Sequence, residues 1–235
     1  MKYPIVTFFF IFLLTACGND SSNKNMLLRG EVDGLKKGNL WLQKLEDTLF
    51  VSVDSLEVDG VSAFNFSEEI IDPEVYYLAM SFQDSSDVIK RVPFFAEAGN
   101  LTIHTTLKNY ERDAVITGSA NQAKLDEYKK LMTRFNNQNL ELIEEGLNAM
   151  KDGDDSLATV AQEKQNRLFK GTYLASVNFA KNNSDYEVAP YIMLTQVSDI
   201  NVTYLDTIYG SLSPKIKDSK YGKALESYIE TRKGN

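Results

Sequence analysis

The spacing of apolar residues changes at Gly118-Ser119, and this change limits the folds open to the chain. From Met26 to Gly118, apolar and polar residues alternate with a period of two in short runs. From Ser119 onward, apolar residues recur at near-helical spacing. The first pattern is typical of half-buried strands and the second of amphipathic helices. The sequence therefore predicts a segregated α+β fold, in which an antiparallel β-sandwich (26–118) precedes an α-helical domain (119–235).

Short apolar runs separated by turn signals make up the first part. The runs that we expect as strands are 28–32, 40–45, 50–58, 63–66, 75–82, 88–95, 101–105 and 114–117. Short strands at this spacing favour a sandwich or a barrel. Asp59-Gly60 and, more weakly, Gly99-Asn100 indicate hairpin turns, because glycine accepts a positive φ.

Aromatic side chains are frequent in these runs. We expect them to fill the space between two sheets, because aromatics supply much of the apolar area that a core buries. They are Trp41, Phe64, Phe66, Tyr76, Phe82, Phe94 and Phe95. The alternative is that some of them line a ligand groove.

Two long helices and three shorter ones are expected in the second part. The first is capped by Ser119 and ends before Asp152-Gly153-Asp154-Asp155, and the second continues to Asn182-Asn183. The shorter helices cover 188–197, 202–212 and 219–232. The apolar positions expected on the inner faces of the long helices are Leu125, Tyr128, Met132, Phe135, Leu142, Leu147 and Met150, then Leu157, Val160, Ala161, Leu168, Ala175 and Phe179.

Charged residues alternate in sign along the long helices. Lys124, Asp126 and Glu127 are followed by Lys129 and Lys130, and similar mixtures occur later. Surface helices need a polar side, so we interpret these charges as a solvated face. The alternative is a docking face for a partner helix.

The N-terminus has the features of an export signal. A short basic start and an apolar run from Ile5 to Leu14 predict a signal peptide over 1–16, and this run is too short to span a bilayer. Leu14-Thr15-Ala16-Cys17 resembles the lipobox of bacterial lipoproteins, in which the cysteine is acylated. Residues 17–25 then form the lipidated Cys17 and a polar, flexible tether. An ordinary cleaved signal peptide is the alternative.

Membrane attachment through acyl chains on Cys17 follows from this resemblance. Gly18 follows Cys17 where aspartate would suggest retention in the inner membrane. We therefore expect a protein of the cell envelope on the periplasmic face of the outer membrane.

The scarcity of reactive side chains excludes several kinds of chemistry. The chain of 235 residues has one Cys and one His, which leaves no disulfide, no CxxC pair and no multi-cysteine zinc site. A net charge of −8 argues against binding nucleic acid. His104 is interpreted as a strand residue rather than a catalytic base. We predict no catalytic residue, no metal and no cofactor.

Adjacent carboxylates are the remaining candidates for acid–base or calcium chemistry. They are Glu68-Glu69, Glu144-Glu145 and Asp154-Asp155. Neighbours in sequence do not establish the separation across a cleft that paired catalytic carboxylates require. The Asp152–Asp155 segment also lacks the register of an EF-hand loop.

Asp-Ser/Thr-aliphatic tripeptides recur and resemble an O-glycosylation sequon of bacterial envelope proteins. The hydroxyl residues concerned are Thr48, Ser55, Ser156 and Thr207. Such dipeptides also mark turns and helix caps, so both interpretations stay open.

Ordered short motifs carry a family resemblance. They are Leu28-Arg29-Gly30-Glu31-Val32, Val53-Asp54-Ser55, Asp59-Gly60, Phe64-Asn65-Phe66, Tyr76-Tyr77-Leu78, 94–103 and Ile116-Thr117-Gly118-Ser119. Over roughly Met26–Leu131 the chain resembles the domain-of-unknown-function 4369 (DUF4369) family. That resemblance implies a β-domain that usually precedes a thioredoxin-like domain in membrane-tethered thiol–disulfide oxidoreductases. The sequence contains no CxxC, so the resemblance transfers no redox residue.

The leading hypothesis is therefore that the protein is a non-catalytic lipoprotein, which acts as a binding or assembly module with an envelope protein partner. One alternative is a lipoprotein that binds a glycan or a peptide on exposed aromatics. The other is the truncated or split half of a thiol–disulfide oxidoreductase.

Overall fold

The structure is a computed structural model that describes residues 23–82 and 85–234. The expected signal peptide, Cys17 and most of the tether lie outside the described residues, as does the side chain of Phe82.

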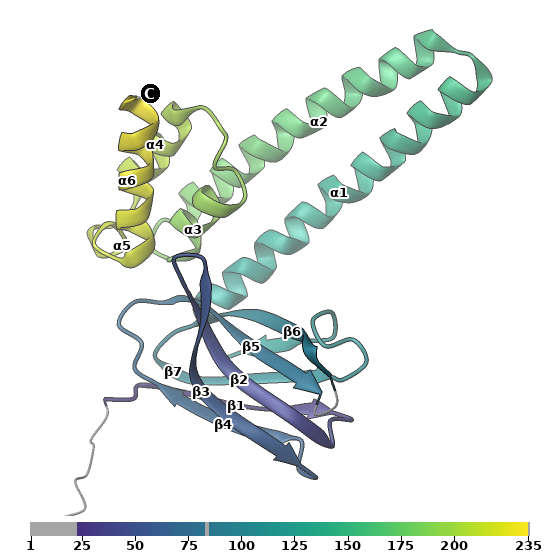
Figure 1. The fold of residues 1–235 in the computed structure, drawn as a ribbon. Coiled ribbons are helices and arrows are strands. Elements are labelled where there is room, and N and C mark those ends of the chain that lie inside the picture. The colour runs from purple at the N-terminus through teal and green to yellow at the C-terminus, as the bar shows by residue number, and fades with distance from the viewer. Residues whose placement is uncertain (1–22, 83–84, 235) are drawn as a thin grey trace, which may run out of the picture.

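Strands come first along the described chain, and helices follow (Figure 1). The strands are β1 (Met26–Asp33), β2 (Lys37–Glu46), β3 (Leu49–Asp59), β4 (Ala63–Glu68), β5 (Glu74–Phe82), β6 (Ser85–Ala96), β7 (Gly99–Thr106) and β8 (Val115–Thr117). The helices are α1 (Ala120–Asp152), α2 (Asp155–Asn182), α3 (Val188–Thr195), α4 (Val202–Ser211), α5 (Pro214–Lys217) and α6 (Lys220–Gly234). The expected α+β class is confirmed.

Two four-stranded sheets form a sandwich, with strand orders β4-β1-β7-β8 and β3-β2-β5-β6. All pairs are antiparallel except β1–β7, which is parallel. The expected purely antiparallel pairing therefore fails at one position. β1 and β7 lie far apart in sequence, and the period of a strand carries no information on its direction relative to such a neighbour.

Asp59-Gly60 and Gly99-Asn100 were expected to form hairpin turns, and neither does. Asp59-Gly60 connects β3 to β4, and Gly99-Asn100 lies at the start of β7 after β6, so both connections pass between sheets. A glycine with positive φ reverses the chain whether or not the two strands pair. A hairpin is found instead at Asp47-Thr48, where Asp47 has φ 54° between β2 and β3.

The sandwich core contains Phe64, Phe66, Tyr76 and Phe94, as expected. Trp41 is only half-buried, on the outer side of β2. Phe95 is buried on the outer side of β6, against the helices. These last two corrections have one cause: alternate residues of a strand face opposite sides of the sheet, and the helices cover part of the outer side.

The two long helices form an antiparallel hairpin that extends away from the sandwich (Figure 1). Ser119 caps α1, because its Oγ accepts a hydrogen bond from the Gln122 amide at 3.0 Å. Gly153, with φ 74°, ends α1, and Asp154 caps α2 by accepting from the Leu157 amide at 2.9 Å. The expected boundaries of both helices are thus explained by their caps.

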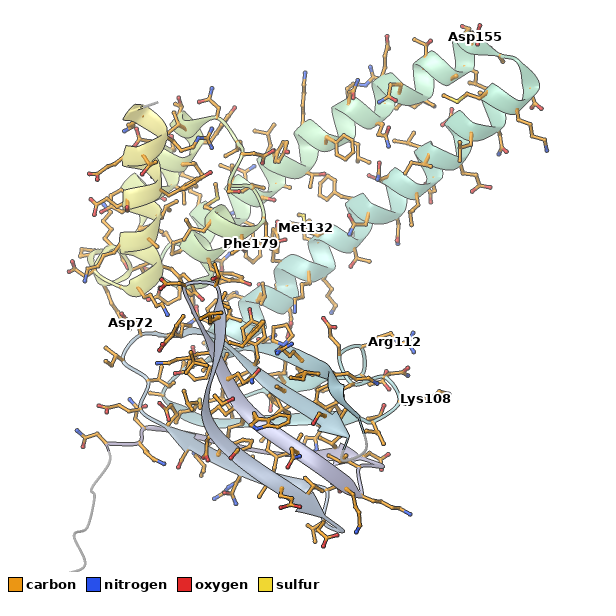
Figure 2. All side chains as sticks on the ribbon, in the orientation of Figure 1. Asp72, Lys108, Arg112, Met132, Asp155 and Phe179 are labelled. Atoms are coloured by element: carbon orange, nitrogen blue, oxygen red, sulfur yellow. The ribbon has the colours of Figure 1, made fainter. Side chains whose placement is uncertain are left out.

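The expected inner faces of the long helices are only partly correct. Tyr128 is buried, and Met132 and Phe179 pack against the same cluster at the base of the hairpin (Figure 2). Leu147 and Met150, which were expected on the inner face of α1, are exposed, as are Leu157 and Val160 of α2. Near-helical spacing fits the stripe that packs against the other helix and also the exposed stripe one residue away along the chain. It therefore cannot say which of the two is buried.

A second core holds the C-terminal helices together. It includes Leu205, Ile208, Leu225 and Ile229 from α4 and α6, packed with the end of α2. The short helix α5 begins at Pro214, where the sequence predicts only a separator.

A third, smaller cluster joins the helices to the sandwich. Val75 and Phe95 of the sheet pack against Leu125, Val188 and Ile192 of the helices. Polar contacts accompany this cluster. Tyr221 Oη accepts from the Val75 amide at 3.0 Å, and Gln122 Oε1 accepts from the Phe95 amide at 3.0 Å.

Candidate functional site

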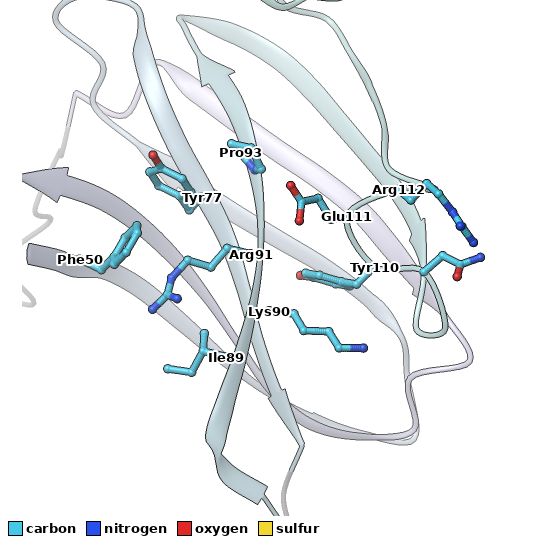
Figure 3. Close-up of a pocket in the computed structure, with 10 residues that line it drawn as sticks. Phe50, Tyr77, Ile89, Lys90, Arg91, Pro93, Tyr110, Glu111 and Arg112 are labelled. Carbon is cyan, nitrogen blue, oxygen red and sulfur yellow. The ribbon is translucent and has the colours of Figure 1, made fainter. Parts of the chain in front are cut away.

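A cleft of about 670 Å³ surrounds the outer strand β6 (Figure 3). We call it the β6 cleft; it is lined by Phe50, Tyr77, Ile89, Lys90, Arg91, Pro93, Asn109, Tyr110, Glu111 and Arg112. Phe50, Tyr77 and Arg91 lie on one side of β6, and residues of the β7–β8 connection lie on the other. Three strands of one sheet and a loop from the other therefore contribute to it.

Two aromatic rings and a guanidinium form one side of the cleft. The rings of Phe50 and Tyr77 meet edge to face, with centroids 4.9 Å apart and an interplanar angle of 88°. The Arg91 guanidinium carbon lies 4.0 Å from the centroid of the Phe50 ring. This distance permits a cation–π interaction, which holds the charge beside the apolar surface.

Arg91 is oriented by a second residue on its own sheet. Arg91 Nε donates to Gln43 Oε1 at 3.1 Å, and Gln43 Nε2 donates to Ser52 Oγ at 3.1 Å. This chain runs across β6, β2 and β3 and uses one edge of the guanidinium. A guanidinium has further N–H groups, which can bind a planar acceptor such as a carboxylate.

The loop on the other side is anchored by Tyr110. Its Oη donates to the Leu78 carbonyl at 3.3 Å, and its ring lies in the sandwich core. Burial raises the pKa of Tyr110 far above its usual range, so the hydroxyl stays a donor. The neighbours of this fixed residue, Glu111 and Arg112, line the cleft.

The charge of the cleft differs from that of the whole chain. Among the described lining residues, Arg91 and Arg112 contribute two guanidinium cations and Glu111 one carboxylate, whereas the chain carries a net charge of −8. Arg112 is largely exposed, and its Nε lies 3.9 Å from Asp113 Oδ1. Solvent screens this ion pair, so the pair is weak. The arrangement favours an anionic group on the ligand.

The outer edge of β6 offers backbone groups to the same cleft. The Phe95 amide points away from β5, since it donates to Gln122 Oε1. In an antiparallel pair this orientation alternates, so Arg91 and Pro93 also present their backbone outward. Pro93 has no N–H, as is usual for proline on an edge strand. Within the described residues, no backbone hydrogen bond from another segment reaches Arg91.

Candidates named from the sequence lie elsewhere. His104 is exposed on β7 and pairs with Val115 of β8. Glu145 pairs with Lys164 at 2.7 Å, and Asp154 caps α2. Over 23–82 and 85–234, His, Asp and Glu side chains form no group of three that could hold a metal ion.

The possible glycosylation residues are all exposed but far apart in the fold. Thr48 lies in the β2–β3 turn, Ser55 on β3, Ser156 in the first turn of α2 and Thr207 in α4. The β2–β3 turn accounts for Thr48. Ser156 follows the α2 cap Asp154 by two residues, and Ser55 and Thr207 lie inside elements. Glycosylation stays a prediction, which the intact mass of the mature protein tests.

Sequence reasoning missed the β6 cleft. Phe50, Tyr77 and Arg91 belong to three runs, and they meet only because the sheet order is β3-β2-β5-β6. The one available signal was that all three occupy outward positions of strands whose other face is apolar. That signal cannot say which strands are neighbours.

Comparisons with known proteins find a match for the first part of the chain. No curated protein and no solved structure matches the chain. No helix in the described part is both long and apolar enough to cross a membrane. The family model described as "Domain of unknown function (DUF4369)" matches residues 26–125, which cover the sandwich and the start of α1. The match includes no thioredoxin-like domain. Residues 26–125 of this chain therefore belong to the DUF4369 family.

Proposed function

We propose that the protein is a non-catalytic, lipid-anchored binding module of the bacterial cell envelope. In this proposal Cys17 holds it on the periplasmic face of the outer membrane, and the β6 cleft binds an extended, acidic peptide segment of an envelope protein partner. The observation that carries the proposal is the combination of an open strand edge with a cationic, aromatic surface at Arg91.

An open strand edge supports a peptide as the ligand. A peptide that adds a strand beside β6 can pair with the Arg91 amide and carbonyl and with the Pro93 carbonyl, which face outward. Main-chain pairing of this kind gives affinity, and side-chain pockets give selectivity. Alternate side chains of the added strand would face Phe50 and Tyr77.

The aromatic geometry favours a peptide over a glycan. Phe50 and Tyr77 are nearly perpendicular, at 88°, so the two rings do not combine into one flat surface for a sugar. The Arg91 guanidinium also covers one ring. The excess of positive charge at the cleft favours acidic side chains or a terminal carboxylate.

Titration with synthetic peptides tests this proposal. The probe is an extended peptide rich in Asp and Glu, compared with its Lys-substituted counterpart and with a copy N-methylated at alternate amides. We expect the acidic peptide to bind and salt to weaken its binding, because salt screens the charges. The Lys-substituted peptide should not bind, and neither should the N-methylated copy, because N-methylation prevents strand pairing. The readout is calorimetry on the full chain in detergent.

A matched pair of variants locates the site. Arg91→Gln should weaken binding by about tenfold or more, since it removes a charge-assisted contact. Arg29→Gln removes the same charge from an exposed position on β1, in the other sheet, and should leave affinity unchanged. Equal binding by the N-methylated peptide, or binding of neutral glycans that Arg91→Gln does not affect, would refute the proposal.

A further inference from the structure

An apolar stripe on α1 is exposed along the outer half of the long hairpin. It consists of Leu140, Ile143, Leu147 and Met150, which are 64%, 40%, 61% and 67% exposed. We call it the α1 stripe. Its spacing of three, four and three residues is that of the core positions of a coiled coil. No apolar cluster of the described residues includes these side chains.

The contact between α1 and α2 uses a different set of positions. Asn139 accepts from Gln165 at 2.8 Å, and Gly146 lies opposite Ala161, close enough that an added Cβ would meet the Ala161 Cβ at 3.6 Å. Ala149 continues the same seam and is buried. Each residue of the α1 stripe follows a seam residue by one, so the stripe is turned by about 100° from the seam.

An ion pair shows which side of the hairpin carries the stripe. Glu145 and Lys164 each precede a seam residue, and they pair at 2.7 Å on one side of the hairpin. In antiparallel helices, the residues that follow seam positions share the opposite side. Phe169 follows Leu168 of the seam and is 47% exposed, so it lies on the side of the α1 stripe.

The borders of the α1 stripe carry no cluster of like charge. On α2, at the level of the stripe, the residues that follow seam positions are the neutral Thr159, Gln162 and Asn166. Along the outer border of the stripe on α1 lie Glu144 and Lys151, which have opposite charges. An identical surface can therefore approach without electrostatic repulsion.

We propose that the α1 stripe is a self-association surface, on which the hairpin of a second copy of this chain packs to form a four-helix bundle. A two-fold axis places the same surface on both copies, and this surface matches itself in spacing and in charge. This inference concerns a surface remote from the β6 cleft and does not depend on the proposed function.

The available area suits a reversible dimer. Beyond Met132, about 20 residues of each helix extend freely, which corresponds to a length of about 30 Å. Two packed helices are about 20 Å wide, so one side offers about 600 Å² and a pair of copies about 1,200 Å². That is the lower limit of specific, stable interfaces, so we expect dimers that dissociate on dilution.

Sedimentation of the full chain in non-ionic detergent, over a wide range of concentration, tests the proposal. The wild-type chain should shift from monomer to dimer as concentration rises. Leu140→Gln with Leu147→Gln should raise the dissociation constant on the order of 100-fold, because four leucine side chains leave the interface. Both leucines are exposed in the monomer, and glutamine is a good helix former, so the variant should fold.

The matched control changes two leucines on the other side of the hairpin. Leu157 and Leu174 are 42% and 47% exposed and precede seam positions. Leu157→Gln with Leu174→Gln should dimerise like the wild-type chain. Three outcomes would overturn the proposal: a wild-type chain that stays monomeric at its highest concentration, a stripe variant that dimerises normally, or a control that is weakened equally. Circular dichroism verifies the helix content of both variants.

Discussion

At the scale of single residues, Gly30 explains how closely three neighbouring strands of one sheet pack. Gly30 of β1 lies between β4 and β7, in a motif that contributed to the family resemblance. A Cβ at this position would overlap the Ile103 carbonyl oxygen and would lie 2.6 Å from Cζ of Phe64. The absence of a side chain therefore lets the Phe64 ring lie over the β1 backbone and fill the core.

Gly30→Ala should destabilise the protein by about 3 kcal/mol or more, because the added methyl group forces β7 or the Phe64 ring to move. Gly210→Ala is the matched control. Nothing lies within 4 Å of a Cβ at this exposed position in α4, so alanine should stabilise by about 0.5–1 kcal/mol. Urea unfolding measures both changes, and a neutral Gly30→Ala would contradict the close approach.

Glu187 is a second residue with a specific energetic consequence. Its side chain is 2% exposed at the start of α3, and it accepts from Ser219 Oγ at 2.7 Å. Burial raises the pKa of Glu187 to about 7 from the ordinary 4.5, against the opposing effect of the Ser219 hydrogen bond. The nearby Asp72 carboxylate adds to the rise and Lys215 opposes it.

This shift predicts a dependence of stability on pH. Between pH 4.5 and about 7 the folded chain holds a proton that the unfolded chain releases, so stability falls as pH rises through this window. The loss should reach up to about 3 kcal/mol. Glu187→Gln keeps the acceptor for Ser219 and should remove this part of the slope, whereas Glu141→Gln, on an exposed part of α1, should not. Urea titrations on both sides of the window measure the slope.

At the scale of elements, the sequence predicted where strands and helices lie far better than how they pair. Period, turn residues and caps act locally, so β6 and α1 begin and end close to the expected residues. Partner choice depends on contacts between distant residues, such as Leu28 of β1 beside Leu101 of β7. The parallel pair, the connections between sheets and the exposed half of the hairpin therefore escaped the sequence pattern.

The attachment of α1 to the sheet is one such long-range contact. Gln122 Oε1 accepts from the Phe95 amide at 3.0 Å, and Gln122 Nε2 donates to Asp126 at 2.8 Å. Gln122→Met should destabilise by about 1–3 kcal/mol, because the buried Phe95 N–H loses its acceptor. Gln138→Met, on an exposed turn of the same helix, should stay within about 0.5 kcal/mol. Hydrogen exchange at the Phe95 amide should accelerate only in the first variant.

For the whole molecule, three apolar clusters of unequal size set the arrangement. The sandwich and the C-terminal helices each have a core, and the smaller cluster around Phe95 and Tyr128 joins them. In the described part of the chain, the long hairpin is fixed at its base and its far end extends away from the sandwich and the C-terminal helices, as Figure 2 shows at the labelled Asp155. The β6 cleft and the α1 stripe are therefore separate surfaces, which allows a ligand and a second copy to bind at once.

The same separation makes membrane attachment testable without disturbing the fold. Cys17 precedes the described part of the chain, and β1 starts at Met26, so a change at Cys17 should leave the sandwich intact. We expect the wild-type chain in the membrane fraction, with acyl mass on Cys17, since two or more acyl chains anchor stably.

Cys17→Ser should move the protein to the soluble fraction or leave the signal peptide uncleaved, and in either case the protein should carry no acyl mass. Ser22→Ala is the control and should stay acylated. A wild-type chain of unmodified mass in the soluble fraction would contradict the lipid anchor, and with it the envelope location that the proposed function requires.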